Sequence, residues 1–267
     1  MRKLFFIFVI IIPNLITGQD LNHWILEKNL KSKDIVEKKI AFLIANSNYE
    51  NLNLSLKNPL NDVKKISISL VKLGFTIVKK EDVTLEQLNK TINIFKDSLK
   101  NYDFGLFYYA GHGLEDQNGN PYILPIDANE LTSIKNNSES LNDMINFFGS
   151  QIKKCLVIID ACRNKGNNGL HKPNNINHPD FVKLWYSTSS GKTASDEEFI
   201  FNGNPTGATL YANVLSIFLE KANETDLNIS EIFQLVYKSV KIISDSTEHK
   251  QSPSQFYGPE LNTIYFK

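Results

Sequence analysis

The sequence predicts an α/β fold whose mainly parallel sheet is covered by helices on both faces. Three observations lead to this class. Short apolar runs that suit strands buried on both faces alternate with longer segments whose apolar residues have helical spacing. Parallel strands need crossovers of about a dozen residues or more, and helices of that length supply them. With 267 residues and 42% hydrophobic composition, the chain can bury the core of one domain.

The first half of the chain has clear boundaries for each element. Gly74 ends the first helical pattern, as glycine commonly does beyond a helix C-terminus. Thr84 and Gln87 have the spacing of a capping box at the start of the second helix. The predicted elements are strands at 40–46 and 75–80 and helices at 58–73 and 84–99.

The second half continues the same alternation. The segment 165–180 is rich in Asn, Gly, Pro and His, and it is too long for an ordinary connection. We therefore expect a binding loop, a processing site, or both. The predicted elements are strands at 104–109, 155–159, 182–187 and 263–266 and helices at 141–148, 209–221 and 229–243.

The N-terminal residues 1–18 have the layout of a secretory signal peptide. Two basic residues precede an apolar stretch that ends at Pro13, and small residues follow it. The stretch is too short to span about 30 Å of hydrocarbon, so we expect an exported protein, periplasmic or secreted, without a stable anchor. An N-terminal membrane anchor is the alternative. Residues 19–38 are expected to be a linker or pre-domain segment, and residues 39–267 the folded domain.

The charge and the cysteine content argue against several functions. Lys+Arg and Asp+Glu both number 29, so no global field recruits nucleic acid. The histidines are scattered and only two cysteines exist, so we expect no metal site and no cofactor, with calcium dependence left open. If the segment between Cys155 and Cys162 is a strand, it holds the two thiols roughly 23 Å apart, beyond disulfide reach.

One histidine and one cysteine directly follow predicted strands. His112 follows the third strand and Cys162 the fourth, and ligands of parallel α/β sheets bind at the carboxyl ends of strands. If these strands are neighbours, the imidazole and the thiol share one rim. A thiolate formed beside a histidine attacks a carbonyl, and the imidazolium protonates the leaving amine. Gly111 would let the chain turn sharply, and the amides of Gly113 and Cys162 would stabilise the oxyanion.

Each of these residues has a simpler interpretation. A lone histidine between glycines is more often a hydrogen-bonded loop residue, and a lone cysteine at a strand end is more often a small buried hydrophobe. The convergence of His112 and Cys162 on one rim favours catalysis. Cys155 stands at the start of its strand, at the opposite edge of the sheet, so we expect it to serve packing alone.

The stretches YYAGHG at 108–113 and DACRNKG at 160–166 resemble the two catalytic motifs of the caspase-like cysteine peptidases, the clan of caspases, metacaspases and paracaspases. The pattern is most similar to prokaryotic metacaspase-like members. The resemblance implies a caspase-like fold with a six-stranded sheet. It also implies a large-subunit portion at 39–164 and a small-subunit portion at 181–267, divided by the loop at 165–180. The implied activity is that of a cysteine endopeptidase with Cys162 as nucleophile and His112 as general acid/base.

Two acidic residues predict the substrate preference. Asp160 lies two positions before Cys162, and side chains two apart on a strand point the same way, about 6.6 Å apart. A carboxylate there favours Arg or Lys before the scissile bond, although Asp160 could instead accept hydrogen bonds from the turn or pair with Arg163. The resemblance supports the first view, because metacaspase-like and paracaspase-like members carry Asp at this offset and cleave after basic residues. Asp62 matches a position that lines their primary pocket.

The expected partner is therefore a peptide or protein substrate. Self-processing is also expected, by cleavage after Arg163, Lys165 or Lys172 in the polar segment beside the nucleophile. Two other classes remain open. One is a catalytically silent caspase-like module that binds or scaffolds other proteins, and the other is a thiol amidase acting on small amides.

Overall fold

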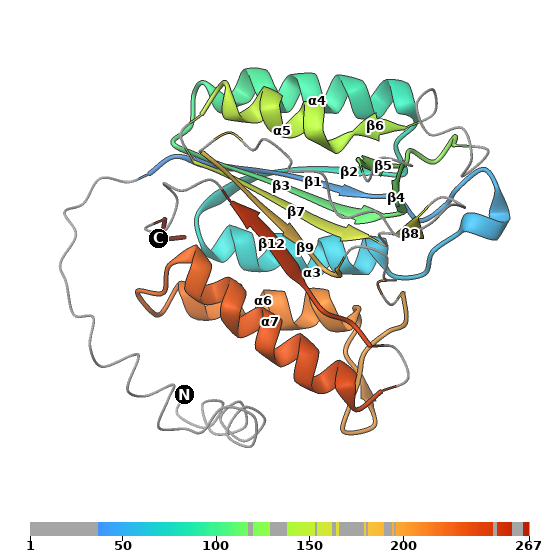
Figure 1. Cartoon of the computed structure of the whole chain (residues 1–267). Coiled ribbons are helices and arrows are strands. Elements are labelled where there is room, and N and C mark those ends of the chain that lie inside the picture. The colour runs from blue at the N-terminus through green and yellow to red at the C-terminus, as the bar shows by residue number, and fades with distance from the viewer. Residues whose placement is uncertain are drawn as a thin grey trace.

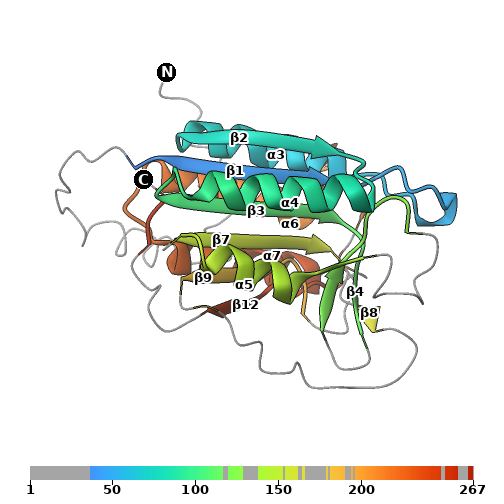
Figure 2. The same cartoon turned by 90° about the horizontal axis from the view of Figure 1, so that it is seen from above.

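A six-stranded sheet forms the centre of the protein in the computed structural model. Its strands are β1 (Lys39–Ala45), β2 (Phe75–Glu81), β3 (Phe104–Gly111), β7 (Cys155–Ala161), β9 (Val182–Tyr186) and β12 (Ser254–Tyr257). The strand order is β12-β9-β7-β3-β1-β2, and every pair is parallel except β9 with β12 (Figure 2). The predicted α/β class with a mainly parallel sheet is confirmed. The structure describes residues 37–116, 120–128, 138–152, 154–161, 164–165, 179, 181–189, 194, 196–247, 250–257 and 264–266.

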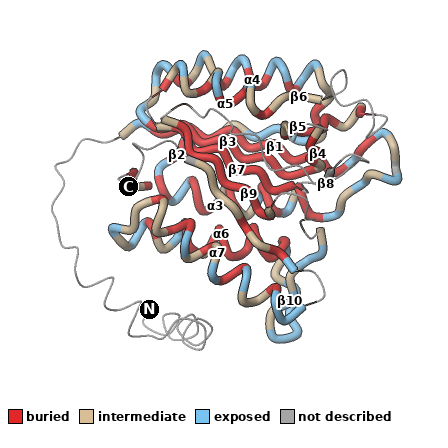
Figure 3. Tube along the Cα trace, in the orientation of Figure 1, coloured by how far each residue is buried: buried red, intermediate tan, exposed pale blue. Residues whose placement is uncertain are grey.

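Helices cover both faces of this sheet, as predicted (Figure 1). One face carries α4 (Leu85–Leu99) and α5 (Leu141–Gly149), and the other carries α3 (Pro59–Lys72), α6 (Leu210–Ala222) and α7 (Ile229–Asp245). Successive strand side chains point to opposite faces, so Phe107 of β3 packs in one core and Leu106 in the other. This double coverage explains why β1 and β3 are buried along their whole lengths (Figure 3).

The helix ends follow their local sequence. The Thr84 hydroxyl accepts a hydrogen bond from the Gln87 N–H at 3.3 Å, and the Gln87 side chain accepts one from the Thr84 N–H at 3.1 Å. The predicted capping box is therefore present at α4. Gly74 follows α3 with a φ of 81°, a left-handed conformation that glycine adopts without steric cost.

The sixth strand lies earlier in the chain than predicted. β12 occupies Ser254–Tyr257, whereas Tyr265, inside the predicted strand 263–266, forms only an isolated bridge with Asn228. The prediction was wrong because Ile264 and Phe266 are apolar for another reason, since both are buried in the core on the face of α3, α6 and α7. An edge strand such as β12 does not need a continuous apolar sequence.

A second, smaller sheet begins immediately after His112. Its order is β6-β5-β4-β8, and its strands are β4 (Gly113–Glu115), β5 (Pro121–Ile123), β6 (Glu139–Ser140) and β8 (Asn164–Lys165). Lys165 pairs with Glu115 of β4, so the prediction that the loop 165–180 begins at Lys165 is wrong at this residue. Two-residue strands leave too little periodicity to be read from the sequence.

A short hairpin, β10 (Ile200–Phe201) with β11 (Asn204–Pro205), was also not predicted. Asn202 and Gly203 at its tip both have positive φ, which suits the Asn-Gly turns of two-residue hairpins. Exposed residues mark the hairpin in Figure 3, so it adds little to either core.

Several predicted features lie outside the described residues. They are the signal peptide at 1–18, most of the segment 19–38, Cys162, Arg163, and most of the loop with Lys172. Within the part of the chain that the structure describes, no helix has the length and apolar character needed to cross a membrane.

Candidate active site

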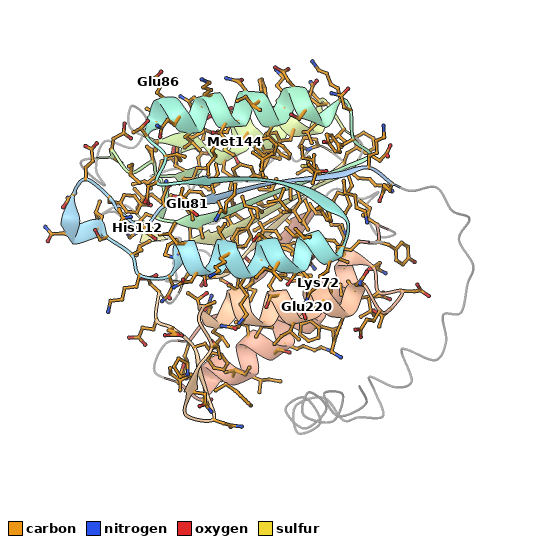
Figure 4. The ribbon with its side chains drawn as sticks, turned by 180° about the vertical axis from the view of Figure 1, so that it is seen from behind. Lys72, Glu81, Glu86, His112, Met144 and Glu220 are labelled. Atoms are coloured by element: carbon orange, nitrogen blue, oxygen red, sulfur yellow. The ribbon has the colours of Figure 1, made fainter. Side chains whose placement is uncertain are left out.

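The carboxyl ends of β3 and β7 lie next to each other. The two strands pair in parallel, with Gly105 opposite Cys155 and Gly111 opposite Ala161, so the predicted third and fourth strands are neighbours. His112 directly follows Gly111, and Figure 4 shows it toward the same end of the sheet as Glu81, the last residue of β2. Cys162 directly follows Ala161 in the sequence and lies outside the described residues.

The imidazole of His112 is held by the loop that follows β1. Its Nε2 lies 2.7 Å from the carbonyl oxygen of Leu54. A carbonyl only accepts hydrogen bonds, so the neutral ring carries its proton on Nε2 and leaves Nδ1 as the basic nitrogen. Burial lowers the pKa of His112, against the opposing effects of the Leu54 contact and the Asp196 charge. A half-buried imidazole that is neutral near pH 7 is suited to act as a general base.

Two buried tyrosines hold the backbone of His112. The hydroxyl of Tyr49 accepts the His112 N–H at 2.8 Å, and the two rings pack with centroids 4.8 Å apart. The hydroxyl of Tyr109 lies 2.9 Å from the carbonyl oxygen of His112 and 2.7 Å from that of Leu124, toward which it donates. The N–H and the carbonyl group of His112 are therefore each contacted by a phenol hydroxyl.

Gly111 is explained by these hydroxyls rather than by a turn. The residue lies within β3, and a Cβ at this position would come 2.5 Å from the Tyr109 hydroxyl oxygen and 2.9 Å from that of Tyr49. The glycine thus leaves space for the groups that hold its neighbour. Gly113 begins β4 opposite Ile123 of β5, so the second glycine of the motif starts the small sheet.

Both predicted substrate-binding acids lie at this rim. Asp160, on β7, accepts a hydrogen bond from the Tyr108 hydroxyl at 2.8 Å, and Asp62, in the first turn of α3, accepts the Thr209 N–H at 2.7 Å. Their exposed fractions are only 8% and 3%. Burial, and then the charge of Asp160, raises the pKa of Asp62 well above its usual range, and burial raises the pKa of Asp160 to about 6. The two carboxylates are close enough to disfavour each other's charge.

A third carboxylate, Asp196, belongs to the same site and was not predicted. Its side chain accepts hydrogen bonds from the N–H groups of Lys57 at 2.7 Å and Asn58 at 3.0 Å, just before α3. Its charge raises the pKa values of Asp62 and Asp160. Asp196 stands in an irregular segment without periodicity, so only tertiary contacts bring it to the rim.

No lysine or arginine of the described ranges forms an ion pair with any of these three acids. A buried carboxylate without a cation is costly, and a positive group arriving from outside would relieve the repulsion among them. Among the described residues, burial and mutual repulsion therefore disfavour the charged forms of Asp62 and Asp160.

Cys155 is fully buried in the core beneath α4 and α5, at the amino end of β7. Burial raises the pKa of its thiol, which disfavours the reactive thiolate. The predicted position of Cys155, at the start of its strand and at the opposite end of the sheet from His112, is confirmed, and it is the position expected of a packing residue.

The variant Cys155→Ala should leave peptide turnover unchanged. It should lower the free energy of unfolding by about 1 kcal/mol, because a small buried side chain is removed. Parallel turnover assays and urea titrations of wild type and variant measure both effects. A tenfold loss of turnover with the fold intact would contradict the packing role.

Comparison with known proteins agrees with the geometry. The family model of the caspase domain, Peptidase C14, matches residues 38–259. Mucosa-associated lymphoid tissue lymphoma translocation protein 1 of Homo sapiens is 34% identical over 109 residues, which are 41% of this chain and 13% of that protein. Its homolog in Mus musculus is 35% identical over 101 residues, 38% of this chain and 12% of that protein. This chain therefore spans a small part of those relatives, and its match to the family model shows that it belongs to the caspase-domain family of peptidases.

Proposed function

We propose that the protein is a cysteine endopeptidase with His112 and Cys162 as its catalytic dyad. The observation that carries the proposal is the pairing of Gly111 with Ala161, because the next residues of these two strands are His112 and Cys162. The contact between His112 Nε2 and the Leu54 carbonyl supports it, since it leaves Nδ1 free to accept a proton.

The reaction follows from these groups. Nδ1 of His112 takes the proton of the Cys162 thiol, and the thiolate attacks the carbonyl carbon of the scissile peptide bond. The backbone amides of Gly113 and Cys162 stabilise the oxyanion of the tetrahedral intermediate. The imidazolium then protonates the leaving amine as the C–N bond breaks. Water, deprotonated by His112, hydrolyses the thioester and restores the free thiol.

We further propose that cleavage follows Arg or Lys. Asp62, Asp160 and Asp196 place three carboxyl groups at the rim where the side chain before the scissile bond is expected to bind, and a cation bound there would favour their ionised forms. Arg can pair with two acceptors at once, whereas Lys binds as a point charge, and both are favoured over Asp, which the three acids repel.

Covalent labelling tests the nucleophile and the pocket together. The thiolate of Cys162 should displace the carboxylate of a tetrapeptide acyloxymethyl ketone ending in Arg and keep the peptidyl methyl ketone as a thioether, as seen by mass spectrometry of the digested protein. The same reagent ending in Asp should react far more slowly, and Cys162→Ala should take up neither. The absence of an adduct would favour the alternative of a catalytically silent binding or scaffold module. Equal labelling by both reagents would contradict the basic preference.

Self-processing is a separate expectation. The candidate sites follow Arg163, Lys165 and Lys172, and pairing of Lys165 with β4 makes the bonds outside β8 the better substrates. After incubation with and without calcium, wild type should give shorter fragments by intact-mass spectrometry, while Cys162→Ala stays whole. Identical masses for both proteins in an active preparation would contradict self-cleavage.

A further inference from the structure

We propose that Asp82 and Tyr49 are positioning residues for His112, with Asp82 acting through the loop of residues 46–56. Neither residue lies in a motif named above. Neither belongs to the dyad or to the three acids Asp62, Asp160 and Asp196. The inference deepens the proposed function, on which it rests, because it explains how the imidazole of the dyad is kept in place.

Asp82 anchors the start of this loop. Its Oδ1 accepts the N–H groups of Ser47 at 2.8 Å and Asn48 at 2.9 Å, and its Oδ2 accepts the side-chain amide of Asn48 at 2.6 Å. The Asp82 N–H donates to the Ala45 carbonyl at 2.8 Å, so one residue ties the end of β2 to the end of β1. Asp82 holds a φ of 49°, which is uncommon outside glycine, and its three accepted hydrogen bonds accompany that conformation.

The carboxylate of Asp82 remains charged in the working protein. Burial alone would raise the pKa of Asp82, but the hydrogen bonds from Asn48 and Ser47 outweigh it and lower the pKa below its usual value. Hydrogen bonds to an ionised acceptor are roughly twice as strong as neutral ones. The hydrogen bonds that Asp82 accepts therefore keep their strength over the whole pH range in which a Cys-His dyad operates.

The anchored loop supplies two contacts to His112. Leu56 donates its N–H to the Ser47 carbonyl at 3.0 Å, which closes the loop on the residue that Asp82 holds. Between these two ends stand Tyr49, whose hydroxyl accepts the His112 N–H, and Leu54, whose carbonyl accepts from Nε2. A shift of the loop base would move both contacts together.

The hydroxyl of Tyr49 has a role that Phe cannot fill. It is the acceptor for the His112 N–H, and it lies 3.3 Å from the Tyr109 hydroxyl, which donates toward the carbonyl oxygens of His112 and Leu124. Without it, the part-buried N–H of His112 loses its acceptor, at a cost of up to about 1–3 kcal/mol unless His112 moves. A displacement of about 1 Å in a catalytic group can cost about 10²-fold in rate.

The full-length variants Asp82→Ala and Tyr49→Phe test the proposal. Each should lower kcat for an Arg peptide about tenfold or more. KM should change by less than about twofold, because neither side chain hydrogen-bonds to Asp62, Asp160 or Asp196, the acids expected to bind the Arg side chain. Asp82→Asn should recover most of kcat, because its amide oxygen still accepts from the two backbone N–H groups. The matched controls are Asp97→Ala, an exposed carboxylate on α4, and Tyr102→Phe, just before β3 at the other end of the sheet. Asp82→Ala that behaves like Asp97→Ala would overturn the proposal.

A second readout does not depend on catalysis. In protein labelled with ¹⁵N-histidine, and with His112→Gln used to assign the resonance, wild-type His112 should show the neutral tautomer protonated on Nε2. Asp82→Ala and Tyr49→Phe should show a mixture of tautomers or an averaged signal, because the Leu54 contact is weakened. An unchanged Nε2–H tautomer in both variants would overturn the positioning role even if wild type were inactive. Inactivity of wild type with the expected tautomer shift would instead contradict only the proposed function.

Discussion

Replacing Cys162 or His112 with Ala should abolish peptide hydrolysis while the fold stays intact. The two groups act as a unit, so each single variant should lose at least about 10³-fold in kcat/KM, nearly as much as the double variant. Turnover of an Arg peptide measures the loss, and circular dichroism with thermal unfolding shows that the fold is kept.

The comparison with Cys155→Ala makes this result specific. Cys155 is buried beneath the helices, so Cys155→Ala should keep full turnover. The loss of activity in Cys162→Ala then cannot be due to the removal of just any cysteine. Wild-type turnover in Cys162→Ala would show that the nucleophile is another group, and additive losses in the double variant would show that the two residues act independently.

The second large effect is expected for Asp160→Asn. The substitution keeps the shape of the side chain and removes one buried negative charge from the pocket. Loss of one partner of a buried, hydrogen-bonded charge pair costs about 2–5 kcal/mol, so cleavage after Arg or Lys should fall by roughly 10²-fold or more in kcat/KM. Iodoacetamide should still alkylate Cys162, which separates a damaged pocket from a lost nucleophile. Unchanged turnover of Arg and Lys peptides would contradict the assignment of Asp160.

The same variant should be more stable than wild type at pH 7. The pKa of Asp160 is about 6 in the folded protein and about 3.9 in the unfolded chain, so the folded state binds more protons between these values. Stability is therefore lost as the pH rises from about 4 to about 6, and the loss persists at pH 7. Asp160→Asn removes it, by an amount on the order of 1–3 kcal/mol.

Urea unfolding at pH 7 and below pH 4 measures this effect. The gain in the free energy of unfolding should be present at pH 7 and absent below pH 4, where the wild-type carboxyl is protonated in both states. The exposed Asp97→Asn should change stability by less than about 0.5 kcal/mol at pH 7. A less stable Asp160→Asn at pH 7 would mean that the carboxylate serves the fold rather than a ligand.

The sequence predicted the elements whose burial or ends leave a clear pattern. β1 and β3 are buried along their whole lengths because both of their faces are covered, and β1 is apolar from Ile40 to Ala45. α4 begins at the capping box formed by Thr84 and Gln87. The sixth strand was misplaced because the apolar residues near the C-terminus bury themselves in a core without joining the sheet. The spacing of apolar residues in the sequence indicates which residues are buried, but it does not show which strands pair with each other.

The site was predictable to the same extent. His112, Asp62 and Asp160 stand at element ends, where the rule for parallel sheets applies directly. Leu54 and Tyr49 could not be found this way, because one acts through a backbone carbonyl and the other through a hydroxyl that reaches a residue 63 positions away. Tertiary packing of an irregular loop creates both contacts, and no local sequence pattern predicts them.

The most direct test of the proposed peptidase function is the turnover of fluorogenic peptides that differ only in the residue before the scissile bond. Rapid release is expected from the Arg or Lys peptide, little from the Asp peptide, and none from any peptide with Cys162→Ala. Faster turnover of the Asp peptide than of its Arg counterpart, or turnover that survives in Cys162→Ala, would contradict it.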